Sequence, residues 1–404
     1  MSEMSYLEKL LDGVEVEWRN LGDTSLFEIA NNGRKPVKAS LRIAGETPYY
    51  GANNIQDYVD GYTHDGEYVL IAEDGSASLE NYSIQYATGK FWANNHVHVV
   101  RGKERVHSRF LYHYLCIVNF LPFLTGGGRA KLTKGQLIEI PVPIPCPDNP
   151  EKSLAIQSEI VRILDKFTAL TAELTAELTA ELNMRKKQYN YYRDQLLSFK
   201  EGEVNWTTLG NEELFHICAG GTPSKSKAEY WDNGSIPWLK SESCNNKPVY
   251  FSKDFISELG LKKSTAKLLP KNTTLIALVG ATIFKTAFLE FEATTNQNIA
   301  SIKSTKENII ADKFIFYFLT NLYNTLKSEM RNYGMLNLTN LRQFRIPIPC
   351  IAEQKRIVSI LDKFDALTNS ITEGLPREIE LRQKQYEYYR DLLLSFPKPE
   401  TVSK

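Results

Sequence analysis

The sequence predicts an α+β protein with a pseudo-two-fold internal repeat, in which two long antiparallel coiled-coil helices join two globular α/β domains. Three observations predict this fold. The chain of 404 residues is long enough for two hydrophobic cores. The sequence of its second half resembles that of its first half, and an apolar stripe at helical spacing follows each globular segment. We place the globular domains at 1–150 and 201–349 and the helices at 151–200 and 350–404.

Short matching strings mark the repeat. Ile163-Leu-Asp-Lys-Phe167 recurs as Ile360-Leu-Asp-Lys-Phe364, and the segment 188–199 recurs almost unchanged at 385–396. Both matches lie 197 positions apart (360 − 163 and 385 − 188). Between the matched ends the sequences diverge almost completely, so the same fold with different surface loops is the simplest interpretation.

Fainter matches survive inside the divergent domains. The strings that begin at Leu70, Phe110 and Lys131 resemble those that begin at Leu275, Phe314 and Asn337. The domain openings around Trp18 and Trp206 differ by 188 positions, and the domain ends at Ile140 and Ile346 differ by 206. The second domain is therefore about 18 residues longer than the first (206 − 188).

Two long amphipathic helices are predicted over 154–199 and 353–396, because apolar residues recur mostly three or four positions apart. A tandem Leu-Thr-Ala-Glu repeat runs through the first helix over 170–182. The helices have equal length between matched landmarks (188 − 164 and 385 − 361 are both 24), as an antiparallel pair would need. Gly374 and Pro376 should break or kink the second helix, because proline lacks an amide donor.

Composition indicates an ordinary soluble protein, with 42% hydrophobic and 24% charged residues. The five cysteines form no CxxC pair, which argues against a disulfide framework or structural zinc and favours a reduced, cytoplasmic location. We expect neither a signal peptide nor a membrane span, because the chain has no apolar run of sufficient length.

Catalytic signatures are missing from the sequence. It holds no GxxxxGK(S/T) loop, no GxGxxG after a strand, no HExxH and no Pro-Pro pair of a DNA methyltransferase motif, so we expect a non-enzymatic protein without metal or cofactor. His96 and His98 alternate along an apparent strand and should point to one face, but no further ligand for a metal suggests itself. The glycines at 126–128 with Arg129 fit either a phosphate contact or a plain turn.

Several longer motifs point to a known family. They are Gly220-Gly-Thr-Pro223, Tyr230-Trp231 and Ile236-Pro-Trp238 in the second domain, Tyr49-Tyr-Gly51-Ala and Ile55-Gln-Asp-Tyr58 in the first, and Ile346-Pro-Ile-Pro349 with Glu353-Gln354 at a helix entry. On these motifs the whole chain resembles the specificity subunit of type I restriction-modification systems. The resemblance implies two target recognition domains that read the halves of a split site in double-stranded DNA.

The same resemblance implies partners: two methyltransferase subunits and, for cleavage, two restriction subunits that translocate DNA and cut it. No membrane is involved. The net charge of zero is unusual for a DNA-binding protein, because phosphate contacts normally require a basic excess. Only 203–345 is basic, with 17 Lys and Arg against 13 Asp and Glu, whereas 15–140 has 13 against 14. Partner subunits would then have to supply many of the contacts with the DNA phosphates.

Base readout needs side chains with paired donors and acceptors on loops that a rigid scaffold holds. In the first domain the candidates are Arg34, Lys35, Lys38, Tyr50, Asn53, Asn54, Lys90, Arg129 and Lys131. In the second domain they are Ser224, Lys225, Lys227, Lys240, Asn245, Asn246, Lys247, Asn296, Gln297 and Arg331. A solvated loop or a strand cap is the alternative for each of them. Trp231 and Trp238 fit a core better than a stacking site.

The helical stripes fit two uses: pairing with each other, and docking of the methyltransferase subunits. The residues proposed for these contacts are Phe167, Leu174, Leu178, Leu182, Tyr189, Tyr192, Phe364, Leu367, Ile371, Tyr386 and Tyr389. A helix of about 40 residues would also act as a ruler of roughly 60 Å. One added four-residue repeat would advance a domain by about 6 Å and turn it by about 40°, which would re-space the target by roughly one base pair.

Two other functions remain open at this point. A tandem coiled-coil adaptor that binds proteins instead of DNA would suit the zero net charge. A self-contained methyltransferase or nuclease would need the motifs that are missing.

Overall fold

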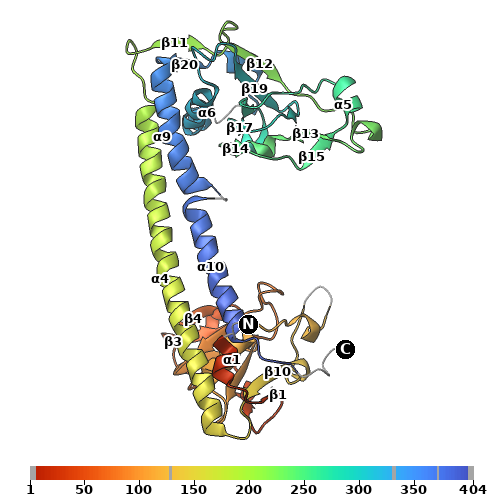
Figure 1. Ribbon diagram of the computed structural model, residues 1–404, viewed down its shortest axis with the longest axis vertical. Coiled ribbons are helices and arrows are strands. Elements are labelled where there is room, and N and C mark those ends of the chain that lie inside the picture. The colour runs from red at the N-terminus through yellow and green to blue at the C-terminus, as the bar shows by residue number, and fades with distance from the viewer. Residues whose placement is uncertain (1–5, 127–129, 330–333, 371–372, 399–404) are drawn as a thin grey trace. The chain divides into compact units, whose positions relative to one another are not determined.

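The computed structural model describes residues 6–126, 130–329, 334–370 and 373–398. The chain divides into two compact units. Unit 1 comprises Met1–Glu177 and Ile379–Lys404, and unit 2 comprises Leu178–Glu378. Each unit therefore combines one globular domain, the helix segment that follows it, and a helix segment from the other half of the sequence (Figure 1).

Two four-stranded sheets form the globular domain of unit 1, in the strand orders β2-β9-β6-β7 and β4-β3-β8-β5. The pair β3 and β8 is parallel. The strands are β1 (Val16–Asn20), β2 (Phe27–Ile29), β3 (Ala44–Tyr50), β4 (Ile55–Val59), β5 (His64–Asp65), β6 (Tyr68–Ala72), β7 (Ile84–Ala87), β8 (Lys90–Ala93), β9 (Val97–Gly102) and β10 (Pro141–Pro145). The helices are α1 (Tyr6–Leu11), α2 (Ser108–Leu115), α3 (Lys134–Leu137) and the long α4 (Pro150–Leu196), and β1 pairs with β10.

Unit 2 repeats this plan with a five-stranded sheet, β12-β19-β16-β17-β14, and a three-stranded sheet, β15-β13-β18. Its strands are β11 (Asn205–Thr208), β12 (Phe215–Ala219), β13 (Ile236–Leu239), β14 (Lys247–Val249), β15 (Asp254–Ile256), β16 (Thr274–Ala277), β17 (Thr286–Leu289), β18 (Thr294–Thr295), β19 (Ile299–Ser304) and β20 (Arg345–Ile348). Its helices are α5 (Glu258–Lys262), α6 (Asp312–Asn321), α7 (Tyr323–Glu329), α8 (Leu338–Arg342) and α9 (Ile351–Asn369), while α10 (Gly374–Leu393) continues into unit 1.

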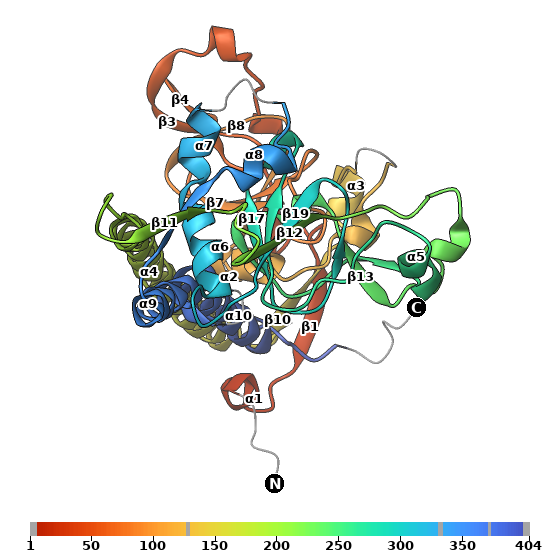
Figure 2. The ribbon, with the colours of Figure 1, turned by 90° about the horizontal axis from the view of Figure 1, so that it is seen from above.

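The central strands and the helix beside them explain the core of each domain. All five residues of β6 and all four of β16 are buried. This is typical of strands that are covered on both faces. In α2, Phe110, Leu111 and Tyr114 lie on one helical face and join the core. The equivalent α6 packs against β16 and β17. Figure 2 shows α6 beside β17 from above.

The end of the second long helix completes the core of unit 1. Leu393, Leu394 and Phe396 are buried in it, and the ring of Phe396 meets that of Phe110 edge-on at 5.9 Å. In unit 2 the residues at and just after the end of α4 do the same, among them Leu196, Leu197 and Phe199. Each globular core is therefore closed by a segment from the other half of the sequence, so the repeat extends to the packing.

The helix pairs within each unit follow the same rule. In unit 1, Phe167 of α4 contacts Tyr389 of α10 with ring centroids 5.9 Å apart, and the Thr168 and Tyr386 hydroxyls lie 3.0 Å apart. In unit 2, Tyr192 of α4 stacks on Phe364 of α9 at 5.8 Å. The predicted antiparallel helix pairing is confirmed at these matched positions.

Gly374 interrupts the second helix, as predicted. Its φ is +79°, a left-handed conformation that residues with a side chain rarely adopt. The preceding helix, α9, ends at Asn369, and α10 begins at Gly374. Pro376 sits in the first turn of α10, where its missing N–H leaves no helical hydrogen bond unmade.

Two details of the sequence interpretation are wrong. His96 and His98 do not share a strand face: His98 lies in β9 and is fully buried, whereas the His96 side chain lies in the preceding turn and is 49% exposed. The faint match at Lys131 is also shifted. Thr133 and Asn337 both cap a helix N-terminus, so Thr133 corresponds to Asn337 and not to Thr339.

Candidate nucleic-acid interface

A buried glutamine ties each globular domain to its long helix. In unit 1, Gln157 of α4 accepts a hydrogen bond from the His107 backbone N–H at 2.8 Å and donates to the Arg105 carbonyl at 3.2 Å. This side chain is fully buried, so each bond is shielded from water. The Gln157 amide therefore fixes the chain just before α2.

The equivalent glutamine of unit 2 makes the same pair of bonds. Gln354 of α9 accepts from the Ala311 N–H at 2.8 Å and donates to the Ile309 carbonyl at 2.9 Å. Gln157 and Gln354 lie 197 positions apart (354 − 157), which is the offset of the helix repeat. The two units therefore share this contact residue by residue.

A helix carboxylate provides the second contact in unit 1. Asp165 accepts hydrogen bonds from Arg109 Nε at 2.9 Å and from His113 Nε2 at 2.7 Å. Burial alone would raise the pKa of Asp165, but the bonds from His113 and Arg109 outweigh it and hold this pKa below its usual value. Burial also lowers the pKa of His113, so the neutral imidazole is favoured there.

Asp362 plays the same part in unit 2. It accepts from the Tyr317 hydroxyl at 2.5 Å and pairs with Lys313 Nζ at 3.0 Å. Burial, and then the bond to Asp362, raise the pKa of Tyr317 far above its usual value. We call each set of Gln, Asp and their partners a clasp: Gln157, Asp165, Arg109 and His113 in unit 1, and Gln354, Asp362, Lys313 and Tyr317 in unit 2.

Several residues of the first domain that were predicted to contact DNA form hydrogen bonds or ion pairs within the protein instead. Arg34 Nη1 lies 2.6 Å from Glu73 Oε2 and 2.8 Å from the Val97 carbonyl, and Lys131 Nζ lies 3.0 Å from Glu73. Asn53 donates to the Gly75 carbonyl at 2.8 Å. These side chains are held by the protein before any DNA binds.

The other predicted residues of this domain differ in exposure. Tyr50 packs edge-on against Phe91, and Lys90 lies 4.8 Å from the centre of the Tyr62 ring. Lys35, Lys38 and Asn54 are exposed. Arg129 lies outside the described residues, as do Gly127 and Gly128 of the predicted phosphate loop.

The second domain divides its candidates in the same way. Lys240 pairs with Asp254 at 2.8 Å, Lys227 donates to the Tyr230 hydroxyl at 3.1 Å, and Asn246 accepts from the Thr286 N–H at 2.9 Å. Lys225, Asn245 and Lys247 are exposed, and Ser224 bonds to the neighbouring Ser226 hydroxyl at 2.8 Å. Arg331 lies outside the described residues.

Asn296 and Gln297 occupy one turn, between β18 and β19. Asn296 is buried and accepts from the Asn298 N–H at 3.1 Å, whereas Gln297 is exposed and accepts from the Thr222 hydroxyl. Trp238 is buried and meets Trp231 edge-on at 5.0 Å, which agrees with the expected core role.

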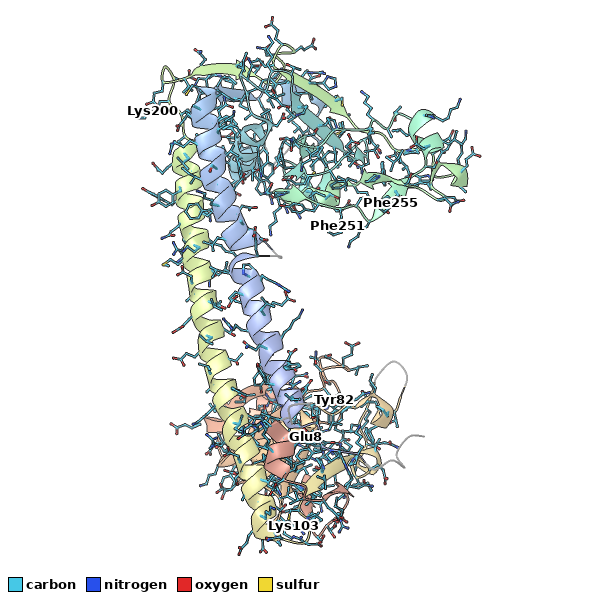
Figure 3. The ribbon with its side chains drawn as sticks, viewed as in Figure 1. Glu8, Tyr82, Lys103, Lys200, Phe251 and Phe255 are labelled. Carbon is cyan, nitrogen blue, oxygen red and sulfur yellow. The ribbon has the colours of Figure 1, made fainter. Side chains whose placement is uncertain are left out.

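Both domains expose an aromatic side chain on an outer strand. Tyr58 of β4 is 54% exposed and lies opposite Pro48, and Phe255 of β15 is 41% exposed and lies opposite Pro237. Phe255 is labelled in Figure 3, together with the exposed Phe251. The sequence interpretation did not select these aromatics, because the alternation that marks them appears only once the strands are paired.

The residues proposed for subunit contacts lie along the helices. Phe167, Tyr189, Tyr192, Phe364, Tyr386 and Tyr389 take part in the helix pairs, and Leu174, Leu178, Leu182 and Leu367 are half-buried. Ile371 lies outside the described residues. Tyr191 and Tyr388, which fit either an interface or a solvated helix end on the sequence alone, are 62% and 64% exposed at matched positions of the repeat.

The clasp residues were also missed, although the sequence held a signal. Asp165 and Asp362 stand at the centre of the repeated Ile-Leu-Asp-Lys-Phe string, where the same charge interrupts the apolar stripe in both copies. Within the described residues, no group of three or more His, Cys, Asp or Glu side chains is placed to hold a metal ion. Among the same residues, no helix is long and apolar enough to cross a membrane.

Two globular domains with matched clasps and unmatched loops define a protein built from one repeated unit whose two copies expose different side chains. The family model of the type I restriction modification DNA specificity domain matches residues 14–184 and 203–381, and the chain belongs to this family. Its function is DNA recognition within a type I restriction-modification system. This finding does not support the adaptor alternative.

Curated relatives match along almost the whole chain. A putative type I restriction enzyme specificity subunit of Haemophilus influenzae, S.HindORF215P, is 50% identical over 402 residues, which cover 97% of this chain and 98% of the relative. The EcoR124I/EcoR124II specificity subunit of Escherichia coli is 45% identical over 423 residues and covers all of both chains. The Escherichia coli EcoprrI specificity subunit is 36% identical, with 92% and 93% covered.

Solved structures share the fold at low sequence identity. A chain from structural work on complex assembly and conformational transition of the type I R-M system is 15% identical, with a TM-score of 0.57 over 94% of this chain and 97% of the other. The HsdS subunit from Thermoanaerobacter tengcongensis is 14% identical, with a TM-score of 0.51 over 94% and 95%. At this identity the likeness concerns the fold.

Proposed function

We propose that the chain is the non-catalytic specificity subunit that reads a two-part DNA target for a type I restriction-modification complex. In this proposal each globular domain reads one half of the target, and the helices fix an unread gap between the halves. The observation that supports it best is the contrast between matched clasps and unmatched loops. A shared attachment with a variable surface is what two interchangeable readers would require.

The proposed domain organisation assigns residues 1–150 and 201–349 to the two target recognition domains. Residues 151–200 and 350–404 form the conserved helices. Arg34, Asn53 and Lys131 would position loops, since their polar groups are already bonded within the protein. The ammonium groups of Lys35, Lys38 and Lys225 have no hydrogen bond among the described residues and would contact phosphates.

Two methyltransferase subunits are the proposed partners of the helices, with two restriction subunits joining for cleavage. Tyr191 and Tyr388 support two equal docking surfaces, because both are largely exposed at positions 197 apart (388 − 191). Each tyrosine packs edge-on against its neighbour, Tyr192 or Tyr389, at 5.4 Å. Such rigid exposed aromatics are typical of interface hot spots.

The deciding experiment is co-expression of this chain with the methyltransferase gene next to its own, followed by single-molecule mapping of DNA methylation. We expect a methylated motif with two halves and a fixed gap, which disappears when the methyltransferase is expressed alone. The purified chain with a methyl donor should methylate nothing. A motif that persists without this chain, or no motif at all, would refute DNA reading.

A further inference from the structure

Both domains contain the same tight turn at the end of the main sheet. In unit 1 it spans 94–96, between β8 and β9, and in unit 2 it spans 296–298, between β18 and β19. The first residue of each turn is a buried asparagine whose Oδ1 accepts from the backbone N–H two residues later, at 2.8 Å in unit 1 and 3.1 Å in unit 2. The second residue, Asn95 or Gln297, is exposed.

Three loops converge on this turn in unit 1 through main-chain hydrogen bonds. The Glu73 N–H donates to the His96 carbonyl at 2.8 Å, and the Leu132 N–H donates to the Glu73 carbonyl at 2.8 Å. The Lys35 N–H donates to the Ala93 carbonyl at 3.0 Å, just before the turn. The Glu73 segment therefore holds the turn directly, while the Leu132 segment binds Glu73 and the Lys35 segment binds the residue before the turn.

The equivalent bonds recur in unit 2. The Leu278 N–H donates to the Asn298 carbonyl at 2.8 Å, and the Leu336 N–H donates to the Leu278 carbonyl at 2.8 Å. The Gly221 N–H donates to the Thr295 carbonyl at 2.9 Å. One main-chain frame is thus preserved in two domains whose sequences have diverged.

The side chains on this frame differ between the domains. Beside Asn95, His96 Nδ1 lies 2.5 Å from Asp74 Oδ1, whereas unit 2 has Asn298 and Val279 at the corresponding places. A constant main chain with variable exposed side chains is what residues that determine sequence preference require, since the frame fixes the position and the side chain selects the partner.

The exposed side-chain amides of Gln297 and Asn95 both have hydrogen-bonding groups that are available to a ligand. The Thr222 hydroxyl donates to Gln297 Oε1, which orients the amide and leaves its Nε2 hydrogens and a second lone pair available. The Asn95 side chain has no hydrogen-bond partner among the described residues, while Arg34 lies 3.4 Å from its backbone carbonyl. Around that turn, Arg34, Lys35 and Lys131 outnumber the two acids Glu73 and Asp74, so the local charge suits DNA.

We propose that Asn95 and Gln297 are specificity-determining residues, each reading the adenine of one A·T pair in its own half of the target. The assignment rests on the proposed function. An asparagine or glutamine amide can donate to adenine N7 and accept from adenine N6 at the same time, a pattern that no other base offers in the major groove.

The test uses the full chain co-expressed with its methyltransferase and a DNA library randomised in both halves of the wild-type motif. Asn95→Ala should lower the preference for A·T at one position of one half by about tenfold to a hundredfold, and Gln297→Ala should do so in the other half only. Each variant is the control for the other. Gln343→Ala, an exposed amide beyond α8, should leave both halves unchanged.

The outcomes separate this inference from the proposed function. If the wild-type chain directs no methylation, DNA reading itself fails. If it directs a two-part motif while both alanine variants keep every preference, the assignment of Asn95 and Gln297 is refuted. An equal loss on all sequences, in variants that melt at the wild-type temperature, would also refute it, because it would indicate a general contact instead of base readout.

Discussion

At the scale of single residues, the clasp carboxylates should hold the globular domains on their helices. Asp165→Ala would remove the acceptor shared by Arg109 and His113 and leave the His113 N–H without its partner. We expect a loss of about 1–3 kcal/mol in the free energy of unfolding, measured by urea titration followed by tryptophan fluorescence. Asp362→Ala should have a similar effect through Tyr317.

The matched control for these variants is an exposed acid outside the clasps. Asp148 fits, and Asp148→Ala should change stability by less than about 0.5 kcal/mol. If Asp165→Ala unfolded at the same urea concentration as Asp148→Ala, the clasp would contribute nothing to stability.

His113 should make the stability of unit 1 depend on pH. Burial lowers its pKa in the folded state, so the unfolded chain binds a proton more readily. Stability should therefore be complete above the unfolded histidine pKa of about 6.5 and should fall as the pH drops below it. His113→Gln, which retains a donor for Asp165, should flatten the melting temperature between pH 7.5 and 5.5. An unchanged slope in that variant would assign the effect to other groups, such as the buried His98, whose pKa burial also lowers.

At the scale of elements, the continuous α4 should set the length of the unread gap. Its Leu-Thr-Ala-Glu repeats lie inside an uninterrupted 47-residue helix. Insertion of one further repeat within 170–182 should retain both half-sites and lengthen the gap by about one base pair, because four residues add roughly 6 Å. Methylation mapping would detect the change. A four-alanine insertion at the same place should act alike, since length and not side-chain identity is proposed to matter, and a gap that stays constant would exclude the ruler.

The positions of the long helices could be predicted from the sequence, whereas the roles of most polar side chains could not. The apolar stripe predicted the long helices, and Gly374 predicted the break, since both depend on local periodicity and backbone freedom. Whether a loop cation is free or bonded depends on residues far away in the sequence. Arg34 looked like a DNA contact until the fold brought Glu73 within 2.6 Å of it.

Internal comparison extended the prediction further than propensity alone. The repeat offset of 197 holds for Gln157 and Gln354 and for Asp165 and Asp362, so polar residues repeated within an apolar stripe could have indicated the clasps. The reading turns could not be aligned in this way, because their shared feature is a main-chain frame that carries different side chains.

At the scale of the whole molecule, the two domains should be exchangeable as units. Replacement of 15–140 by the corresponding domain of a relative should change one half of the methylated motif and leave the other half and the gap unaltered. A change in both halves would contradict independent reading by the two domains.

An exchanged domain must also supply the hydrogen-bond donors that the clasp carboxylate of its new helix requires. A graft of residues 203–345 in place of 15–140 would bring Lys313 and Tyr317 to Asp165, and these side chains already bind the equivalent Asp362 at 3.0 and 2.5 Å. We expect the graft to fold and to direct methylation of a target that holds two copies of the second half-site. The same graft with Lys313→Ala and Tyr317→Phe changed only in the inserted copy should lose stability or tolerate altered gaps, because Asp165 would then have no donor from the domain. Methylation mapping with targets of varied gap length distinguishes these results, and equal behaviour of the two grafts would show that domain attachment does not depend on the clasp.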